Sequence, residues 1–412
     1  MTMAEKILAR ASGHAVVRPG DLVVCDVDVA VQSDASFTGY RMMGAEPAQV
    51  FDPDKVILVT DHAVPAITPD AQDAHARMRA FASEFGLTHF YDVGRHGIMH
   101  QVLAERGHAL PGSLLAAGDS HTCAAGAFNC CARGLGGPEM LFVVSTGKTW
   151  FLVGPTVRFE LSGTLPDGVF PRDVIHHIAG TYGDFVGRNL EFVGPGAAAL
   201  SIGSRQTIAT MSAEVSAEFA LFEADERTLE YVRARTDRAF EPVVSDTDAE
   251  FEAVHQVDLS TLSPQVALPG RVPNNVRPAD GLHGIKITQA FVGSCANGRL
   301  EDLAAVADVL RGRTVHPSVR MIVTPSSQQE YIAAVKAGYV ETIVGANAVV
   351  TGSSCSLCGS NSLGPDDVCI TASTRNFQGR MGSPLAQIYM GSPATVAASA
   401  IKGEITDPRD LD

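Results

Sequence analysis

Short apolar runs that alternate with segments of helical periodicity constrain the fold of this chain more than any other feature. Residues 55–65 (KVILVTDHAVP) have the composition of a buried strand, and residues 69–86 carry apolar side chains at helical intervals and end at a glycine. Further strands are predicted at 114–117, 288–293, 319–325 and up to Val350, and further helices at 124–133, 300–312, 328–337 and 393–402. Strands that alternate with helices predict α/β layers with mostly parallel sheets.

The length of the chain predicts more than one domain. A chain of 412 residues, 45% of them hydrophobic, can bury a large core and exceeds the size of one ordinary domain. Its character changes between about 157 and 280, where an acidic segment (SDTDAEFEA) and a proline-rich segment (LPGRVPNNVRP) follow strand-like and helical runs. We therefore expect a first domain over residues 1–156, a second domain with a linker over 157–280 and a third domain over 281–412.

The charge and hydrophobicity of the chain argue against several classes of partner. The formal net charge is -15 and no run of lysine and arginine is present, so a nucleic-acid partner is not expected. No apolar run is long enough to span a bilayer, and the opening MTMAEKILARASG lacks the continuous apolar region of a signal peptide. Eight cysteines are too few for a disulfide scaffold. We expect a soluble cytoplasmic protein without a membrane partner.

Polar residues follow the predicted strands at the points where the strands end. In parallel sheets, ligands bind beyond the carboxyl ends of the strands, where loops from different strands converge. The residues at these positions are Asp61, His62, Asp119, Ser120, His121, Cys295, Cys355 and Cys358. The run Asp-Ser-His suggests a hydrolase triad, but three consecutive residues cannot pass a proton along a line, and the glycine-flanked nucleophile elbow is missing. A serine hydrolase is therefore not predicted.

The pair Cys355 and Cys358 has the C-x-x-C spacing of metal and redox sites. Structural zinc normally needs four ligands, and no second such pair exists, so zinc is the weaker interpretation. Together with Cys295, three thiolates would leave a fourth position open, as in an iron–sulfur cluster that acts on its substrate as a Lewis acid. A zinc or dithiol redox protein stays open as an alternative. Buried packing is expected for the other cysteines, which are Cys25, Cys123, Cys130, Cys131 and Cys369.

Five segments, in the order GDSHT, VGSCANGRLEDL, CSLC, STRNFQGRMG and SPATVAASAIKG, resemble the aconitase superfamily, with similarity from about Asp54 to the C-terminus. The resemblance implies three α/β/α domains around a central cleft. It implies a [4Fe–4S] cluster held by Cys295, Cys355 and Cys358, and a hydro-lyase that moves water across a 2-hydroxy di- or tricarboxylate through an alkene. Nothing after Gly403 could encode the family's smaller domain, so a separate small subunit is expected to supply the catalytic serine.

The resemblance also assigns roles to individual residues. The proton-handling and hydrogen-bonding wall beside the cluster would consist of Asp61, His62, His100, Asp119, Ser120 and His121, with Glu214 near the substrate. Arg375 and Arg380 fall where the family's substrate-binding arginines lie, and a guanidinium binds a carboxylate through two parallel hydrogen bonds. Solvated or structural roles are expected for the remaining candidates, His96, His176 and His177.

The chain departs from the family pattern at Thr210 and Thr374, where relatives usually have asparagine. Threonine lacks the amide donor pair, so hydrogen bonding around the cluster should be weaker, and we expect an altered substrate or a cluster that is lost easily. Isopropylmalate is the first expected substrate, with homocitrate or homoaconitate, methylated malates and secondary-metabolite analogues as alternatives. A non-enzymatic alternative is a cluster-sensing regulator that binds RNA, which the acidic balance disfavours.

Overall fold

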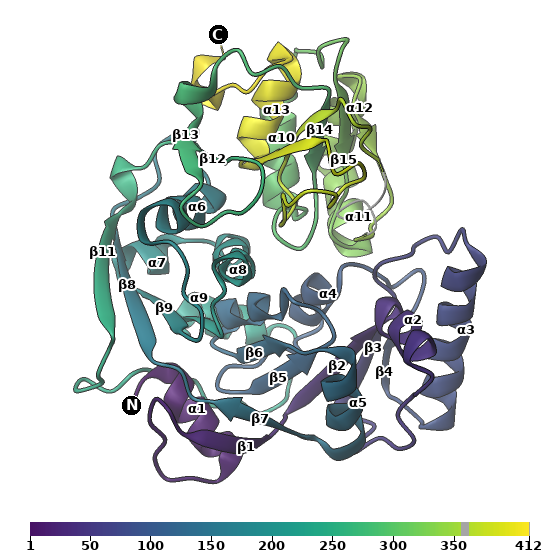
Figure 1. Cartoon of the computed structure of the whole chain (residues 1–412), viewed down its shortest axis with the longest axis vertical. Helices are drawn as coiled ribbons and strands as arrows, with labels where there is room; N and C mark the ends of the chain where they lie inside the picture. Colours follow the sequence, from purple (N-terminus) through teal and green to yellow (C-terminus); the bar gives the residue numbers. More distant parts are fainter. Residues whose placement is uncertain (356–361, 412) are drawn as a thin grey trace. The chain divides into compact units, whose positions relative to one another are not determined.

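The computed structural model describes residues 1–355 and 362–411 (Figure 1). The chain divides into two compact units, each built from two separate stretches of the sequence. Unit 1 consists of residues 1–162 and 185–257, and unit 2 of residues 163–184 and 258–412. The three-domain division stays a prediction. Among the described residues, no helix is both long and apolar enough to cross a membrane.

Unit 1 is built around a parallel sheet of five strands, in the order β4-β3-β2-β5-β6. The strands are β2 (Val29–Ser33), β3 (Val56–Val59), β4 (His89–Tyr91), β5 (Leu114–Ala117) and β6 (Cys131–Gly134). The helices connected to them are α2 (Asp34–Met43), α3 (Pro69–Glu84), α4 (Met99–Glu105) and α5 (Gly137–Thr146). The chain runs outward from β2 to β4 and then returns to β5 on the other side of β2. Such a reversal of strand order creates a crevice at the carboxyl edge, where ligands bind in open α/β sheets.

Local sequence explains why these elements form. All four residues of β3 are buried, and α3 begins where the Thr68 hydroxyl accepts a hydrogen bond from the Ala71 amide, with Pro69 in its first turn. Apolar residues of β2, β3 and β5 pack with those of α2, α3 and α5 in one hydrophobic core. The strand predicted over 55–65 is therefore real but ends earlier, at Val59.

The prediction of a helix over residues 124–133 is wrong. A 3-10 helix, η1 (Thr122–Phe128), occupies the first part, and the last part forms β6. Asn129 adopts a left-handed φ of 61° and ends η1. A side chain at Gly126 would lie 1.7 Å from the Ala220 carbonyl oxygen, so small residues here serve close packing rather than an α-helix. Pairing with β5 then extends the chain as β6.

The rest of unit 1 contains two further sheets. An antiparallel pair is formed by β1 (Leu22–Asp26) and β7 (Lys148–Leu152). The order of the second sheet is β10-β9-β8-β11, with β8 (Thr156–Ser162), β9 (Asn189–Val193), β10 (Ala220–Phe222) and β11 (Ala253–Asp258). The helices are α1 (Met3–Ser12), α7 (Pro195–Ala199), α8 (Ile202–Met211), the 3-10 turn η2 (Ser212–Val215) and α9 (Glu226–Arg233).

Unit 2 contains a seven-stranded sheet in the order β13-β12-β18-β17-β14-β15-β16. Its strands are β12 (Gln265–Ala267), β13 (Val276–Pro278), β14 (Gln289–Val292), β15 (Arg320–Val323), β16 (Val349–Val350), β17 (Val368–Thr371) and β18 (Gln387–Met390). The five strands from β18 to β16 are parallel, and β12 is antiparallel to both neighbours. Its helices are α6 (Pro171–Tyr182), α10 (Leu300–Leu310), α11 (Gln328–Lys336), α12 (Tyr339–Gly345) and α13 (Pro393–Lys402).

Several helix boundaries of unit 2 are where the sequence predicts them. The Ser327 hydroxyl accepts a hydrogen bond from the Glu330 amide at the start of α11, and the Ser392 hydroxyl caps α13 in the same way through the Thr395 amide. Gly403 ends α13 with a φ of 74°, which glycine adopts without steric cost. The predicted α/β class with mostly parallel sheets is confirmed.

Candidate functional site

Three polar segments meet at the carboxyl edge of the unit 1 sheet. Asp34 follows β2, Asp61 and His62 follow β3, and residues 119–121 follow β5, so the three segments come from neighbouring strands. Two of them follow β2 and β5, the strands between which the strand order reverses, and ligands bind at such positions in open α/β sheets. The structure thus brings together the residues of unit 1 that the sequence predicts for the site.

Asp34 holds the loop that carries Asp61 and His62. Its Oδ1 accepts hydrogen bonds from the amides of Asp61 and His62, both at 2.9 Å, and its Oδ2 accepts one from the Ala63 amide at 2.7 Å. Burial by itself would raise the pKa of Asp34, but His75, His62 and these backbone donors outweigh it and lower the pKa well below its usual value. Asp34 is therefore a buried carboxylate. Asp34 was not predicted from the sequence, although its place directly after a strand ending in Ser33 could have indicated a site residue.

Asp61 is buried, and the charges of the Asp34 and Asp119 carboxylates act on it. Its Oδ2 accepts a hydrogen bond from the Met99 amide at 3.0 Å, and its Oδ1 has no hydrogen-bond partner in the described chain. Burial is the main cause that raises the pKa of Asp61 to about 6, although His62 opposes the shift. The Asp61 carboxyl can therefore change its protonation state near neutral pH.

His62 lies among three carboxylates. Its Nδ1 is 3.7 Å from Asp61 Oδ2 and 3.9 Å from Asp34 Oδ1, and its Nε2 is 4.0 Å from Asp119 Oδ2. One third of its side chain is exposed (33%), whereas His100 and His121 are buried. His62 is thus the member of this group that is most open to a ligand.

Two further histidines bind carboxylates directly. His100, on α4, has its Nε2 2.9 Å from Asp119 Oδ1, and the His121 amide donates to the same oxygen at 2.8 Å. On its other side, His121 Nε2 lies 2.8 Å from Oε1 of Glu214, which lies on η2. Carboxylates and imidazoles therefore alternate from His100 through Asp119 and His121 to Glu214, and we call these four residues the His–carboxylate array.

The charges of the array are coupled. Burial would raise the pKa of Asp119, but hydrogen bonds and charge from His100 and His121 hold it well below its usual value. Burial would lower the pKa of His121, and the carboxylates of Asp119 and Glu214 instead raise it. Asp119 is thus ionised, and His121 favours its protonated form. An ionised Asp119 only accepts hydrogen bonds, so His100 carries its proton on Nε2.

Several buried polar atoms near these loops have no hydrogen-bond partner in the described chain. They include both polar atoms of the Gln32 amide, at the end of β2, and the hydroxyls of Ser33 and Thr210. Native proteins rarely leave such groups unpaired, so we add Gln32 to the candidate ligand-binding residues. Gln32 was not predicted, because a single glutamine in an apolar strand does not by itself indicate a ligand-binding role. Ser120 is exposed in the turn after β5.

In unit 2, Cys295 lies in a buried loop between β14 and α10. Arg299 braces this loop by donating to the carbonyl oxygens of Cys295 at 2.6 Å and Ala296 at 2.8 Å. Asn297 donates to Asp302 and accepts from the guanidinium of Arg172, on α6, at 2.7 Å. The loop is thus fixed from both sides by buried polar side chains. Neither Arg172 nor Arg299 was predicted, because residues that stabilise a loop through hydrogen bonds have no recognisable sequence motif.

The other cysteines separate into two groups. Cys355 is partly buried beside the core around Phe291, and Cys358 lies outside the described residues. The five cysteines predicted to be buried are buried, and desolvation raises the pKa of Cys25 to about 11 and that of Cys123 to about 12. Such thiols stay protonated and are poor ligands. Among the described residues, no three His, Cys, Asp or Glu side chains are grouped to hold a metal ion.

The two predicted substrate arginines follow β17. Arg375 and Arg380 are both partly exposed, and Phe377, between them in sequence, packs its ring 5.9 Å from the Arg380 guanidinium. No carboxylate of the described chain pairs with Arg380, whose Nε is buried without a hydrogen-bond partner. An anionic group of a ligand would satisfy it. His176, by contrast, is buried and its Nδ1 lies 3.3 Å from the Gln265 carbonyl oxygen, as expected of a structural histidine.

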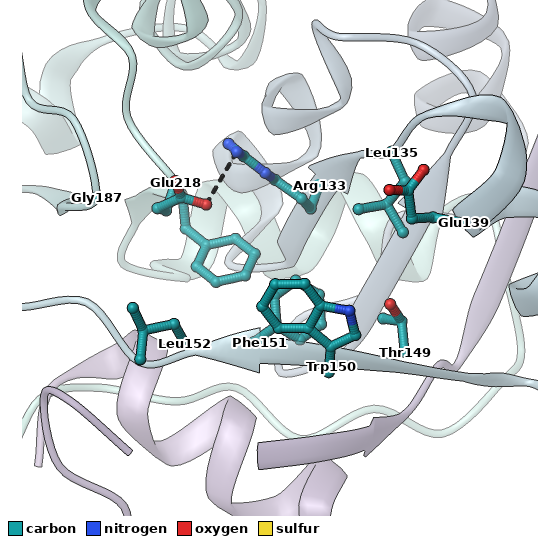
Figure 2. Close-up of a pocket in the computed structure, with 10 residues that line it drawn as sticks. Arg133, Leu135, Glu139, Thr149, Trp150, Phe151, Leu152, Gly187 and Glu218 are labelled. Atoms are coloured by element: carbon teal, nitrogen blue, oxygen red, sulfur yellow. Dashed lines mark ion pairs between the residues drawn. The ribbon is translucent and has the colours of Figure 1, made fainter. Parts of the chain in front are cut away.

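Unit 1 has a pocket of about 320 Å³ whose lining includes none of the predicted site residues (Figure 2). Trp150, Phe151 and Leu152 of β7 form one wall, and Arg133 pairs with Glu218 at 3.0 Å on the opposite side. Besides this ion pair, the polar side chains of its lining are Glu139 and Thr149. The chemistry that the sequence predicts is therefore not located in this pocket.

Comparisons with known proteins agree with the motifs. The model of the aconitase family (aconitate hydratase) matches residues 6–280 and 272–403. The 3-isopropylmalate dehydratase large subunit of Mycolicibacterium smegmatis is 50% identical over 100% of this chain and 97% of the relative. A 3-isopropylmalate dehydratase large subunit of Methanopyrus kandleri is 43% identical over 99% of each chain. The probable methanogen homoaconitase large subunit of Methanothermobacter thermautotrophicus is 41% identical over 99% of this chain and 98% of the relative.

Proposed function

Because the chain belongs to the aconitase family, we propose that it is the cluster-bearing large subunit of a hydro-lyase that dehydrates and rehydrates a 2-hydroxy di- or tricarboxylate. The observation that carries this proposal is the His–carboxylate array, which joins His100, Asp119, His121 and Glu214 at the carboxyl edge of the unit 1 sheet. Removal and addition of water require groups that accept and donate protons near neutral pH, and buried imidazole–carboxylate pairs meet this requirement.

The chemistry of the thiols in unit 2 fits an iron–sulfur cluster. Cys295 and Cys355 are not in disulfides and lie on the loops that follow β14 and β16. Among the described residues, no three His, Cys, Asp or Glu side chains are grouped to hold a metal ion, and the family resemblance supplies Cys358 as the third thiolate. We propose Cys295, Cys355 and Cys358 as the ligands of a [4Fe–4S] cluster. Such a cluster, when bound, supplies a Lewis acid for a hydroxyl and a carboxylate.

The side chains of unit 1 would handle the protons of the reaction. Asp119 is ionised and fixes the proton of His100 on Nε2, and His121 retains a proton between two carboxylates. A protonated imidazole can transfer this proton to a leaving hydroxyl, because it is a general acid near neutral pH. Asp34 accepts a hydrogen bond from the His62 amide, and the partly exposed His62 ring lies near the carboxylates of Asp34 and Asp61. The Arg375 and Arg380 guanidinium groups would bind the carboxylates of the substrate.

We propose isopropylmalate as the substrate, because the relatives with 50% and 43% identity are named for it. Homoaconitate is the second candidate, since a relative with 41% identity is named as a homoaconitase subunit. These relatives are large subunits, so a separate small subunit would complete the site and supply the catalytic serine. Full activity of this chain alone, with a restored cluster, would contradict that part of the proposal.

An anaerobic reconstitution experiment tests the assignment. The chain is purified without oxygen, supplied with iron and sulfide, and mixed with a small subunit of an isopropylmalate dehydratase. We expect iron and sulfide in the protein, and conversion of isopropylmalate through an unsaturated acid that absorbs ultraviolet light. Zinc in place of iron and sulfide, or salt-dependent RNA binding without activity, would favour the alternative functions instead.

Two variants relate the activity to the array. His100→Ala removes the imidazole bound to Asp119 and should lower kcat on the order of 10²–10⁴-fold. His14→Gln changes an exposed histidine that lies near Ser12 and should leave kcat unchanged. If both variants had the kcat of the wild type, the array would not take part in the reaction.

A further inference from the structure

Three serine hydroxyls of unit 2 are buried without any hydrogen-bond partner in the described chain. They belong to Ser326, Ser353 and Ser373, whose exposed fractions are 1%, 0% and 0%. Other buried serines of the same unit are satisfied. The Ser399 hydroxyl donates to the Thr395 carbonyl oxygen at 2.7 Å, and the Ser392 hydroxyl accepts from the Thr395 amide. The unpaired hydroxyls are therefore exceptions that call for a physical reason.

Sheet topology places the three serines around the Cys295 loop. The strands β17, β14, β15 and β16 are consecutive neighbours and run parallel, so their carboxyl ends lie along one edge. Ser373 follows β17, Cys295 follows β14, Ser326 follows β15 and Ser353 follows β16, each by two or three residues. Ser353 is also two residues from Cys355. Two of the unpaired hydroxyls thus lie on the loops that border the Cys295 loop, and the third lies on the next loop along the edge, which also carries Cys355.

The loops contact one another directly. The Ser326 amide donates to the Gly298 carbonyl oxygen at 2.7 Å, which joins the β15 loop to the Cys295 loop. A side chain at Gly298 would lie 2.9 Å from the Thr324 carbonyl oxygen and 3.0 Å from the Ser326 nitrogen, so glycine permits this approach. Between the loops of β15 and β16, the hydroxyls of Thr324 and Thr351 are 2.7 Å apart. The loops after β14, β15 and β16 are therefore joined to one another.

A buried hydroxyl without an acceptor loses the hydrogen bonds that it makes to water in the unfolded chain, and nothing in the described protein compensates for this loss. Sulfide and thiolate sulfur atoms of an iron–sulfur cluster carry negative charge and accept hydrogen bonds, and such bonds help to set the reduction potential of the cluster. Hydroxyl donors would also offset the amide donors that Thr374 lacks.

We propose that Ser326, Ser353 and Ser373 are positioning residues that donate their hydroxyl hydrogens to sulfur atoms of the cluster or of its thiolate ligands. This inference rests on the proposed function, because it requires the cluster. The three hydroxyls stabilise the cluster, raise its reduction potential and slow its loss in air. They do not contact the substrate.

The test uses Ser326→Ala, Ser353→Ala and Ser373→Ala in the full chain, reconstituted anaerobically. Each variant is expected to bind the cluster with a more negative reduction potential, measured by a titration followed by electron paramagnetic resonance. Each is also expected to lose its cluster absorbance several-fold faster in air. Ser→Thr at the same position keeps a hydroxyl and should restore part of both properties.

Ser399→Ala is the matched control, since it also removes a buried hydroxyl but one that has a partner in the protein. Without the cluster, Ser399→Ala should unfold at a lower urea concentration than the wild type, whereas the three test variants should not. This comparison shows that the test variants fold.

The outcomes separate the two proposals. A wild-type protein that binds iron and sulfide, with variants of unchanged potential and unchanged loss in air, would overturn the serine assignment and leave the proposed function intact. A wild-type protein that binds no iron and sulfide after reconstitution would overturn both.

Discussion

His121 Nε2 lies 2.8 Å from Oε1 of Glu214, although the two residues are 93 positions apart in the sequence. The contact joins the loop after β5 to the turn after α8, and it lies on the side of His121 opposite to Asp119. A histidine held between two carboxylates retains its proton to a higher pH than a free imidazole does. Glu214 therefore contributes to the protonation state of the array.

The first prediction concerns Glu214→Gln. The amide keeps the size of the side chain and removes its charge, so the pKa of His121 should fall from its raised value toward that of an ordinary histidine. NMR titration of the His121 ring in both proteins measures the change. Glu218→Gln is the control, because that partly exposed glutamate pairs with Arg133 and not with His121. An unchanged His121 titration in Glu214→Gln would show that Asp119 alone raises the pKa.

The second prediction concerns the pH dependence of stability at Asp61. Its pKa is about 6 in the folded protein and about 3.9 in an unfolded chain, so the folded state binds this proton more tightly. The free energy of unfolding should therefore fall as the pH rises from about 4 to about 6, by about 3 kcal/mol from this group. Asp61→Asn resembles the protonated form at every pH and should lack this contribution. Urea unfolding of both proteins across that range measures it, and parallel pH profiles would contradict the prediction.

The third prediction concerns Asp34→Ala. This change leaves the amides of Asp61, His62 and Ala63 without their acceptor, and each buried amide that stays unpaired costs about 1–3 kcal/mol. The free energy of unfolding should fall by about 3 kcal/mol or more, and hydrogen exchange at residues 61–63 should become faster. Asp70→Ala breaks only an exposed pair with Arg41 and should change stability little. Unchanged exchange at residues 61–63 would rule out this role of Asp34.

The fourth prediction concerns Gly134→Ala at the end of β6. The added carbon would lie 2.1 Å from the Asp119 carbonyl oxygen and 2.8 Å from the Ser120 Cα, so the backbone of the site must shift. We expect a loss of about 1–3 kcal/mol in unfolding free energy and a weaker contact between His100 and Asp119. Gly39→Ala is the control, since nothing lies within 4 Å of its added carbon in α2. There the change should be neutral or stabilising by up to about 1 kcal/mol. Thermal unfolding and His100 chemical shifts test the pair.

Much of the secondary structure could be predicted because its signals are local. The buried run of β3, the threonine cap of α3 and the serine caps of α11 and α13 depend on residues within a few positions of one another. The error at 124–133 has the opposite cause. There the small residues allow the backbone to lie close to Ala220, which is distant in the sequence. No local periodicity could predict this contact.

The sequence by itself determined the α/β class, the strand ends that carry Asp61, Asp119 and Cys295, and the motifs that identify the family. Only the tertiary structure decided which of these residues meet. Asp34 binds the loop after β3, and Glu214 binds His121, because of the strand order β4-β3-β2-β5-β6 and the packing around it. Strand order results from pairing between distant segments, whereas periodicity and caps act within a few residues. The chemistry of the candidate site therefore depends on contacts that no single segment of the sequence encodes.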